Sequence, residues 1–395
     1  MTRTQARMVA GGLGLLSLPL LFAGLAQGQV TGTMGFADPA FQAVWNRTDL
    51  PVANHTTVRT WYWGPAPNSP GLIEPNAESP GGVRLVQYFD KSRMEINNPT
   101  ANRNDQFFVT NGLLTVELIS GRMQVGASQY VTRTAACIPA TGDPGDTTAP
   151  TYAGLQMVSN TTLGDHFAPD RTGQVVTATI SRDGTVGTDP AMGVMTNTRG
   201  AYFDPTTKHN VPEVFWNFLN QSGPIVENGQ PTTGRLNNPW FYASGLPISE
   251  AYWTKATIQG RMTNVLIQMY ERRALTYVPT NVPGFQVEMA NIGQHYYDWR
   301  YRGAGSCSGT PGPTFQPTQA ALTPGATGTA MTSTPGATST AVTGTAVTSP
   351  EPTGTIVIAT GTVVRATPLP TGSPNPCLEC RTPTPGGTPA GTPVP

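Results

Sequence analysis

The sequence has few charged residues and no excess of either sign. Charged side chains make up 12% of the 395 residues, against about 25% in a typical globular protein. The 23 basic residues are balanced by 23 acidic ones. Nucleic-acid binding needs clustered Lys and Arg that displace counterions from phosphates. We therefore expect no nucleic-acid partner.

Recognisable catalytic and metal-binding motifs are also missing. The histidines stand singly, without the His-x-x-x-His spacing that places two metal ligands on one helix face: His55, His166, His209 and His295. No Gly-x-Ser-x-Gly nucleophile elbow occurs. We interpret His166 as a loop histidine, although Asp165 and Asp170 nearby leave a metal site or a triad as the alternative. The sequence thus predicts no catalytic residue, no metal and no cofactor.

A long hydrophobic run occurs only near the N-terminus, at residues 8–26. Arg3 and Arg7 precede it, and the small residues Ala26 and Gly28, at positions −3 and −1, mark a cleavage site before Gln29. This pattern is typical of a signal peptide covering residues 1–28. An uncleaved anchor is the alternative, because the run is just long enough to span a bilayer. Either way we expect a secreted or cell-surface protein with no further membrane span.

Cysteine is scarce, and its positions favour disulfides over a metal site. An even number of cysteines in an exported chain indicates disulfide pairing. We expect Cys137 to pair with Cys307. Cys377 and Cys380 would pair locally or with a partner, because no histidine lies nearby to complete a metal site.

Residues 306–395 are rich in Thr, Pro, Gly, Ala and Ser. So polar a composition buries too little apolar surface to offset the entropy of ordering the chain. We expect a disordered tail whose threonines suit O-glycosylation. A wall-spanning spacer and a simple flexible tail both remain open.

The most informative feature of the sequence is an internal repeat. Residues 86–91 (VQYFDK) reappear as residues 267–272 (IQMYER), and flanking landmarks recur in the same order at offsets of roughly 170–180 residues. The repeat places three pairs of carboxylates at equivalent positions in the two copies, and we interpret these residues as structural: Glu74 with Glu250, Asp90 with Glu271, and Glu117 with Glu288.

The secondary-structure signals predict the same elements in each copy. Asp38-Pro39 and Asn210-Val211-Pro212 precede short helices, and β-branched or aromatic runs at 84–89, 113–119, 264–270 and 285–290 indicate strands. Between the copies, residues 174–187 read as a hairpin with an Asp-Gly turn.

These elements predict a β-dominated α+β fold. It comprises repeat lobe 1 at 29–130, a β-rich insertion at 131–207, repeat lobe 2 at 208–305 and the tail. Each lobe would combine a short helix with an antiparallel sheet.

Aromatic residues are the best candidates for ligand binding. Residues 61–63 and 240–242 would alternate between the two faces of a strand. One face could then offer flat rings to sugars or proline-rich chains. The candidate ligand-binding residues are Trp61, Trp63, Trp240 and Tyr242. The alternative is that all these rings fill a small core.

Two family resemblances accompany this interpretation. Residues 245–250 (GLPISE), followed by residues 266–272 and 277–279, resemble LGFP-type repeats, which occur in exported bacterial proteins and tether domains to the cell wall. Residues 86–95, 284–289 and 293–297 resemble a group of exported proteins from filamentous Chloroflexi-type bacteria. Both resemblances imply a surface location, and neither implies an established reaction.

The sequence therefore predicts a non-enzymatic cell-surface or envelope protein that binds wall polysaccharide or peptidoglycan through aromatic-rich modules. A secreted hydrolase acting on wall polymer at a cleft between the lobes is the alternative.

Overall fold

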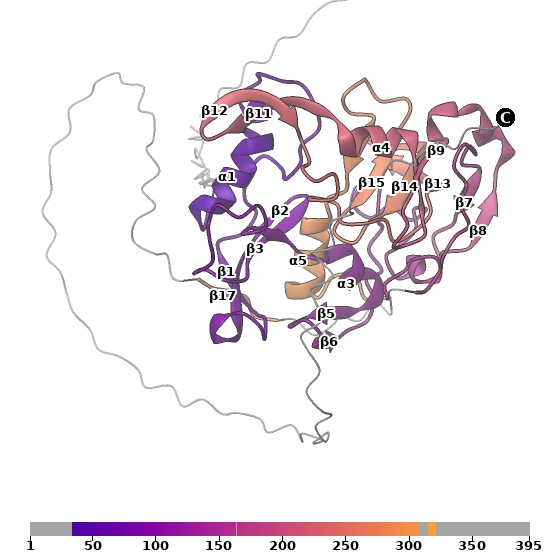
Figure 1. Cartoon of the computed structure of the whole chain (residues 1–395). Coiled ribbons are helices and arrows are strands. Elements are labelled where there is room, and N and C mark those ends of the chain that lie inside the picture. The colour runs from indigo at the N-terminus through magenta and orange to yellow at the C-terminus, as the bar shows by residue number, and fades with distance from the viewer. Residues whose placement is uncertain (1–33, 163, 308–314, 321–395) are drawn as a thin grey trace, which may run out of the picture. The chain divides into compact units, whose positions relative to one another are not determined.

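The computed structural model describes residues 34–162, 164–307 and 315–320. Its helices are α1 (Pro39–Thr48), α2 (Leu50–Ala53), α3 (Leu114–Ser120), α4 (Glu213–Asn220) and α5 (Ile292–Tyr301). Antiparallel strands predominate, so the predicted β-dominated α+β class is confirmed (Figure 1). None of the described helices is long and apolar enough to cross a membrane.

The first sheet has the order β17-β1-β2-β3-β4. Its strands are β17 (Thr318–Gln319), β1 (Leu72–Pro75), β2 (Val83–Phe89), β3 (Ser92–Ile96) and β4 (Thr110–Asn111). The tight hairpin between β2 and β3 pairs Phe89 with Ser92. All neighbouring strands are antiparallel.

The second sheet has the order β16-β15-β14-β13-β7-β8. Its strands are β16 (Val287–Met289), β15 (Ala274–Tyr277), β14 (Arg261–Met269), β13 (Tyr252–Ile258), β7 (Ala178–Ile180) and β8 (Val186–Thr188). Strands β7 and β8 form the predicted Asp-Gly hairpin, and β7 joins β13 in parallel. Smaller two-stranded ladders are β5–β6 (Arg122–Gln124, Tyr130–Thr132), β9–β10 (Gly200–Phe203, Asn210–Pro212) and β11–β12 (Ser222–Glu227, Gln230–Arg235).

Each of the two sheets contains the same set of buried hydrogen bonds, centred on a glutamine. The Gln87 side-chain amide donates to the Ser69 carbonyl at 3.0 Å, and that of Gln268 donates to the Ser249 carbonyl at 2.9 Å. Each serine hydroxyl accepts from the backbone N–H of the residue after the glutamine. The same side chains therefore hold the same loop against the second strand of each repeat segment.

The strand register corrects two of the predicted carboxylate pairs. Glu74 is the third residue of β1, whereas Thr254 is the third residue of β13 and Glu250 precedes that strand. Glu117 lies on helix α3 and Glu288 on strand β16. Only Asp90 and Glu271 occupy matching places, in the β2–β3 and β14–β15 turns.

Helices α3 and α5 cross between the two sheets. Helix α3 follows β4 of the first sheet, yet the Val116 backbone N–H donates to the Glu271 carbonyl of the second hairpin at 3.4 Å. Helix α5 follows β16 of the second sheet, and the N–H groups of Gly293 and Gln294 donate to the Asp90 carbonyl of the first hairpin at 3.0 and 3.3 Å. Figure 1 shows α5 between β3 and α3. Each hairpin turn is therefore held by the helix that follows the other sheet.

The hydrophobic core is continuous across both segments. One buried cluster combines side chains from the first half, such as Phe41, Trp63 and Phe89, with Phe215 and Tyr270 from the second. The β11–β12 hairpin also packs on α1, over which it arches in Figure 1. The segments predicted as lobes thus share their buried clusters within a single compact unit. Residues 330–395, the second unit, lie outside the described residues.

Two local predictions are wrong. Residues 113–119 were expected as a strand but form α3, which ends at Gly121 in the left-handed conformation. Residues 61–63 and 240–242 form loops and turns rather than strands, so the argument from alternating faces does not apply to them. By contrast, the helix start at Asp38 is confirmed: its carboxylate accepts from the Ala40 N–H at 2.7 Å, with Pro39 in the first turn.

The predicted disulfide is present. Cys137 is bonded to Cys307, with a Cα–Cα distance of 5.1 Å across 170 residues of sequence. Cys377 and Cys380, the proposed signal peptide and nearly all of the tail lie outside the described residues.

Candidate functional site

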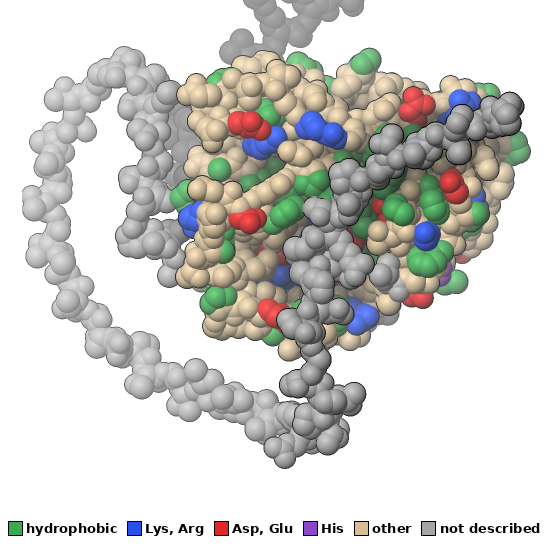
Figure 2. Space-filling model, in the orientation of Figure 1, with side chains coloured by type: hydrophobic (Ala, Val, Ile, Leu, Met, Phe, Trp, Pro, Cys, Tyr) green, Lys and Arg blue, Asp and Glu red, His purple; other side chains and the backbone are tan. Residues whose placement is uncertain are grey.

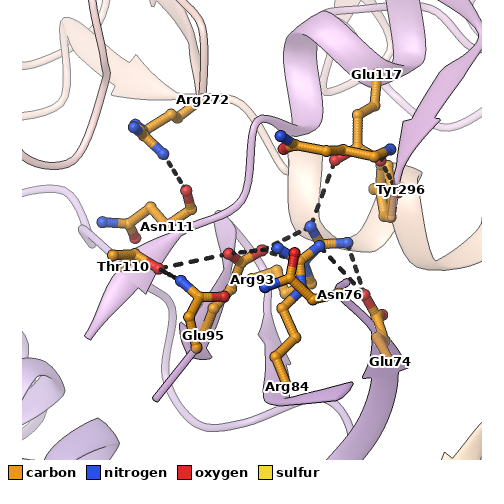
Figure 3. A network of polar contacts seen from close by, with 12 residues as sticks. Glu74, Asn76, Arg84, Arg93, Glu95, Thr110, Asn111, Glu117, Arg272 and Tyr296 are labelled. Atoms are coloured by element: carbon orange, nitrogen blue, oxygen red, sulfur yellow. Dashed lines mark hydrogen bonds and ion pairs between the residues drawn. The ribbon is translucent and has the colours of Figure 1, made fainter. Parts of the chain in front are cut away.

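A buried charge network accounts for several candidate carboxylates. Arg93 of β3 contacts Glu74 of β1 at 3.1 Å, Glu95 of β3 at 2.6 Å and Glu117 of α3 at 3.4 Å. Figure 3 shows these side chains converging from different elements, with Tyr296 of α5 beside Glu117. All of these side chains are buried.

The network is balanced in charge. Glu74 also lies 3.2 Å from Arg300, and Glu95 lies 3.1 Å from Arg84, so three arginines face three glutamates. Burial alone would raise the pKa of Glu74, but the nearby Arg300, Arg93 and Arg84 outweigh it and lower that pKa to about 2. Paired, buried charges of this kind tie α3 and α5 to the first sheet. Because all these groups are buried and paired with opposite charges, we interpret this cluster as structural.

A recess of about 560 Å³ contains other candidate groups. His209 Nδ1 lies 3.2 Å from Glu250 Oε1 and donates to it in the tautomer that carries the proton on Nδ1. The Glu250 carboxylate also accepts from the Asn210 backbone N–H at 2.9 Å and from its side-chain amide at 3.0 Å. Arg171 lies at the same carboxylate, 3.6 Å away.

The other histidines lie away from this group. His166 is exposed at the rim of the recess, and the neighbouring Asp165 and Asp170 are also exposed. His295 packs against Tyr152, whose hydroxyl lies 3.0 Å from His295 Nδ1. Burial, together with Lys91, lowers the pKa of His295 to about 4, so its imidazole is neutral at pH 7. No group of three or more potential metal ligands occurs within residues 34–162, 164–307 and 315–320.

A cluster of partly exposed aromatic side chains forms the third candidate. Tyr202 of β9 stacks on Trp216 of α4 with ring centres 4.3 Å apart, and Trp240 meets Trp216 at 5.3 Å. Phe241 adds a ring 5.5 Å from Trp240. We call these residues, together with Tyr242 and Phe107, the aromatic band.

The band crosses from the second half of the fold to the first. Phe107 is 44% exposed, and its ring centre lies 6.1 Å from that of Tyr242. The Tyr242 hydroxyl donates to the Val109 carbonyl at 3.0 Å, and the Asn111 amide donates to the Tyr242 carbonyl at 3.1 Å. These bonds fix the loop before β4 against the loop that carries Trp240.

The predicted aromatic residues divide into two groups. Trp240 and Tyr242 belong to the aromatic band. Trp63 is only 2% exposed, with its indole N–H donating to the Thr48 hydroxyl at 3.0 Å. Trp61 packs partly buried against the same core, as Trp240 and Tyr242 also do, but it has no ring contact with the band. Trp63 is therefore a core residue, and its ring is not offered to a ligand at the surface.

Sequence reasoning missed four members of the band: Tyr202, Trp216, Phe241 and Phe107. The rings that meet Trp216 come from other elements, Tyr202 from β9 and Trp240 from the loop after β12. The aromatic content of residues 213–220 on a short helix was the available signal, but it did not reveal which rings meet.

Amide side chains lie beside the band, and the Tyr202 hydroxyl donates to the Asp204 carboxylate at 3.2 Å. Asn217, Asn238 and Gln106 are exposed nearby, and the Gln106 amide donates to the Asn238 carbonyl. On the face shown in Figure 2, charged side chains are scattered singly or in small groups over a mostly uncharged surface. Flat rings beside amides suit a neutral ligand that offers both C–H faces and hydroxyl groups.

Comparisons with protein-family models, with curated proteins and with solved structures find no match.

Proposed function

We propose that this chain is an exported cell-envelope protein that binds neutral wall polysaccharide at the aromatic band. The observation that carries the proposal is the contiguous cluster of Tyr202, Trp216 and Trp240, three partly exposed rings that meet one another. The C–H faces of sugar rings stack on such rings, and the nearby amides can hydrogen-bond to sugar hydroxyls.

The proposed location comes from the sequence, where a signal-peptide pattern precedes the folded part and a Thr/Pro-rich segment follows it. The Cys137–Cys307 disulfide supports this location, because structural disulfides persist mainly in oxidising compartments. Cell fractionation combined with external protease treatment tests it. Protein found only in the cytoplasmic fraction would contradict the proposal.

The binding proposal is tested with the full chain and purified, insoluble peptidoglycan or neutral wall polysaccharide. Trp240→Ala and Trp216→Ala should each weaken retention about tenfold, the usual effect of truncating an aromatic at the centre of a binding surface. Tyr130→Ala is the matched control, because Tyr130 is 41% exposed and lies on β6 outside the band. Absence of wild-type binding, or equal binding by all three variants, would contradict the proposal.

The alternative of a secreted hydrolase draws on the His209–Glu250 pair in the recess. Glycoside hydrolysis commonly uses two carboxylates that flank the scissile bond. Among the described residues that line this recess, Glu250 is the one carboxylate. The aromatic band needs no such partner, so binding is the function we propose.

A further inference from the structure

The recess has one apolar wall and one polar wall. The apolar side includes Ala178 of β7 and Val186 of β8, together with the exposed side chains of Met157 and Phe167. The polar side includes Arg171, His209, Asn210 and Glu250. Its volume of about 560 Å³ lies within the usual range for small-molecule sites, about 300–1,000 Å³. It is distinct in its residues from the aromatic band.

The polar wall holds a carboxylate in a fixed position. Glu250 Oε1 takes two contacts, from the Asn210 backbone N–H and from His209. Glu250 Oε2 accepts the Asn210 side-chain amide at 3.0 Å, while Arg171 Nη1 lies 3.6 Å away, beyond hydrogen-bond distance. An oxygen with two lone pairs therefore has one acceptor position open toward a ligand cation.

Two features indicate that these groups are prepared for a ligand. His209 is 1% exposed, and its Nε2 atom has no hydrogen-bond partner among the described residues. A buried polar atom without a partner costs stability, and a bound ligand or a water would supply the missing partner. The Arg171 side chain is 47% exposed and contacts Glu250 only loosely, so it remains able to bind an anion.

We propose that this recess binds a small zwitterion with an apolar side chain, of which a free α-amino acid is the simplest example. Its ammonium group would donate to Glu250 Oε2, and its carboxylate would pair with Arg171. In an α-amino acid both charges sit on one carbon, so their protein partners must be neighbours, as Arg171 and Glu250 are. The apolar side chain would then lie against β7, β8 and Phe167.

The test uses the full chain, titrated calorimetrically with L-leucine, 4-methylpentanoate and 3-methylbutylamine. The second compound lacks the ammonium group and the third lacks the carboxylate. We expect L-leucine to bind at least about tenfold more tightly than either analogue, because each loses one charge-assisted hydrogen bond. Equal affinity for an analogue, or no heat from L-leucine at millimolar concentration, would overturn the proposal.

The site is checked with Arg171→Gln, which should weaken L-leucine binding about tenfold or more while leaving 3-methylbutylamine binding unchanged. Arg302→Gln is the matched control, because the Arg302 side chain is 69% exposed and lies just after α5, outside the recess. Glu250→Gln should weaken both L-leucine and the amine. Unchanged L-leucine binding by Arg171→Gln would place the ligand elsewhere. Trp240→Ala should not affect this binding, so failure of the polysaccharide proposal would leave this result unaltered.

Discussion

Replacing Arg93 with methionine should be among the most destabilising single changes in this fold. The Arg93 side chain is 1% exposed and contacts three carboxylates, at 3.1, 2.6 and 3.4 Å. After the substitution, Glu74 keeps Arg300 and Glu95 keeps Arg84. Glu117 keeps the Tyr296 hydroxyl but loses the guanidinium that contacts it, so the uncompensated charge concentrates there.

The expected cost follows from this arrangement. Breaking a buried ion pair by removing one partner costs about 3–5 kcal/mol, because the remaining charge stays out of water. Arg103→Met provides the control, since Arg103 is 48% exposed where it pairs with Asp38. An exposed pair contributes about 0–1 kcal/mol. Urea unfolding at pH 7, followed by tryptophan fluorescence, measures both free energies of unfolding.

A second substitution tests the cause. Adding Glu117→Gln to Arg93→Met removes the uncompensated charge and should recover part of the lost stability. Similar losses for Arg93→Met and Arg103→Met would refute the reasoning, and so would a double variant that is no more stable than Arg93→Met alone. The first result would mean that the network is hydrated, and the second that the cost comes from lost packing rather than from charge.

Three further predictions concern other parts of the fold. Burial raises the pKa of Asp49 to about 6 although three backbone N–H groups donate to its carboxylate. The contribution of Asp49 to stability is therefore present below pH 3.8 and lost as the pH rises through 6. The urea concentration at the unfolding midpoint should vary less between about pH 4 and 7 in Asp49→Asn than in the wild type. Gly293→Ala should lower the melting temperature although alanine favours helices, because a Cβ at this position would lie 2.0 Å from the Phe89 carbonyl oxygen. Gly35→Ala is the control: a Cβ there meets no atom within 4 Å, so the melting temperature should change little. Cys137→Ser removes the disulfide that joins two residues 170 positions apart and should lower the free energy of unfolding, measured in urea, by about 2–4 kcal/mol. An unchanged unfolding midpoint would count against a structural disulfide.

The parts of the fold that local sequence specifies were predictable. Asp38 and Pro39 mark a helix start, because a carboxylate can cap the free N–H groups and proline fits the first turn. The β-branched and aromatic runs of β2 and β14 were long enough to be recognised as strands. Residues 113–119 were not recognised as a helix, because a short apolar run fits a buried helix as well as a strand. Gly121 was the overlooked signal, since a left-handed glycine commonly ends a helix.

The candidate sites were only partly predictable, because long-range contacts build them. Trp240 and Tyr242 were identified by residue type, but their contacts with Tyr202 and Phe107 depend on how distant loops meet. Glu250 was judged structural by analogy with Glu74. In the structure it lies in the recess beside His209, which precedes it by 41 residues. Glu74 and Glu250 do not occupy matching places in the two sheets, so the analogy between them did not apply.

The crossing of α3 and α5 affects how this protein can be divided. Each helix begins on the hairpin turn of the opposite sheet, through Val116 to Glu271 and through Gly293 to Asp90. A fragment that ended between the two sheets would contain a hairpin without its helix and a helix without its hairpin. We expect neither half to fold alone, whereas the two halves supplied together should reassociate, each completing the other. Shuffling these segments as independent modules should therefore fail, although the sequence repeat suggests that it would succeed.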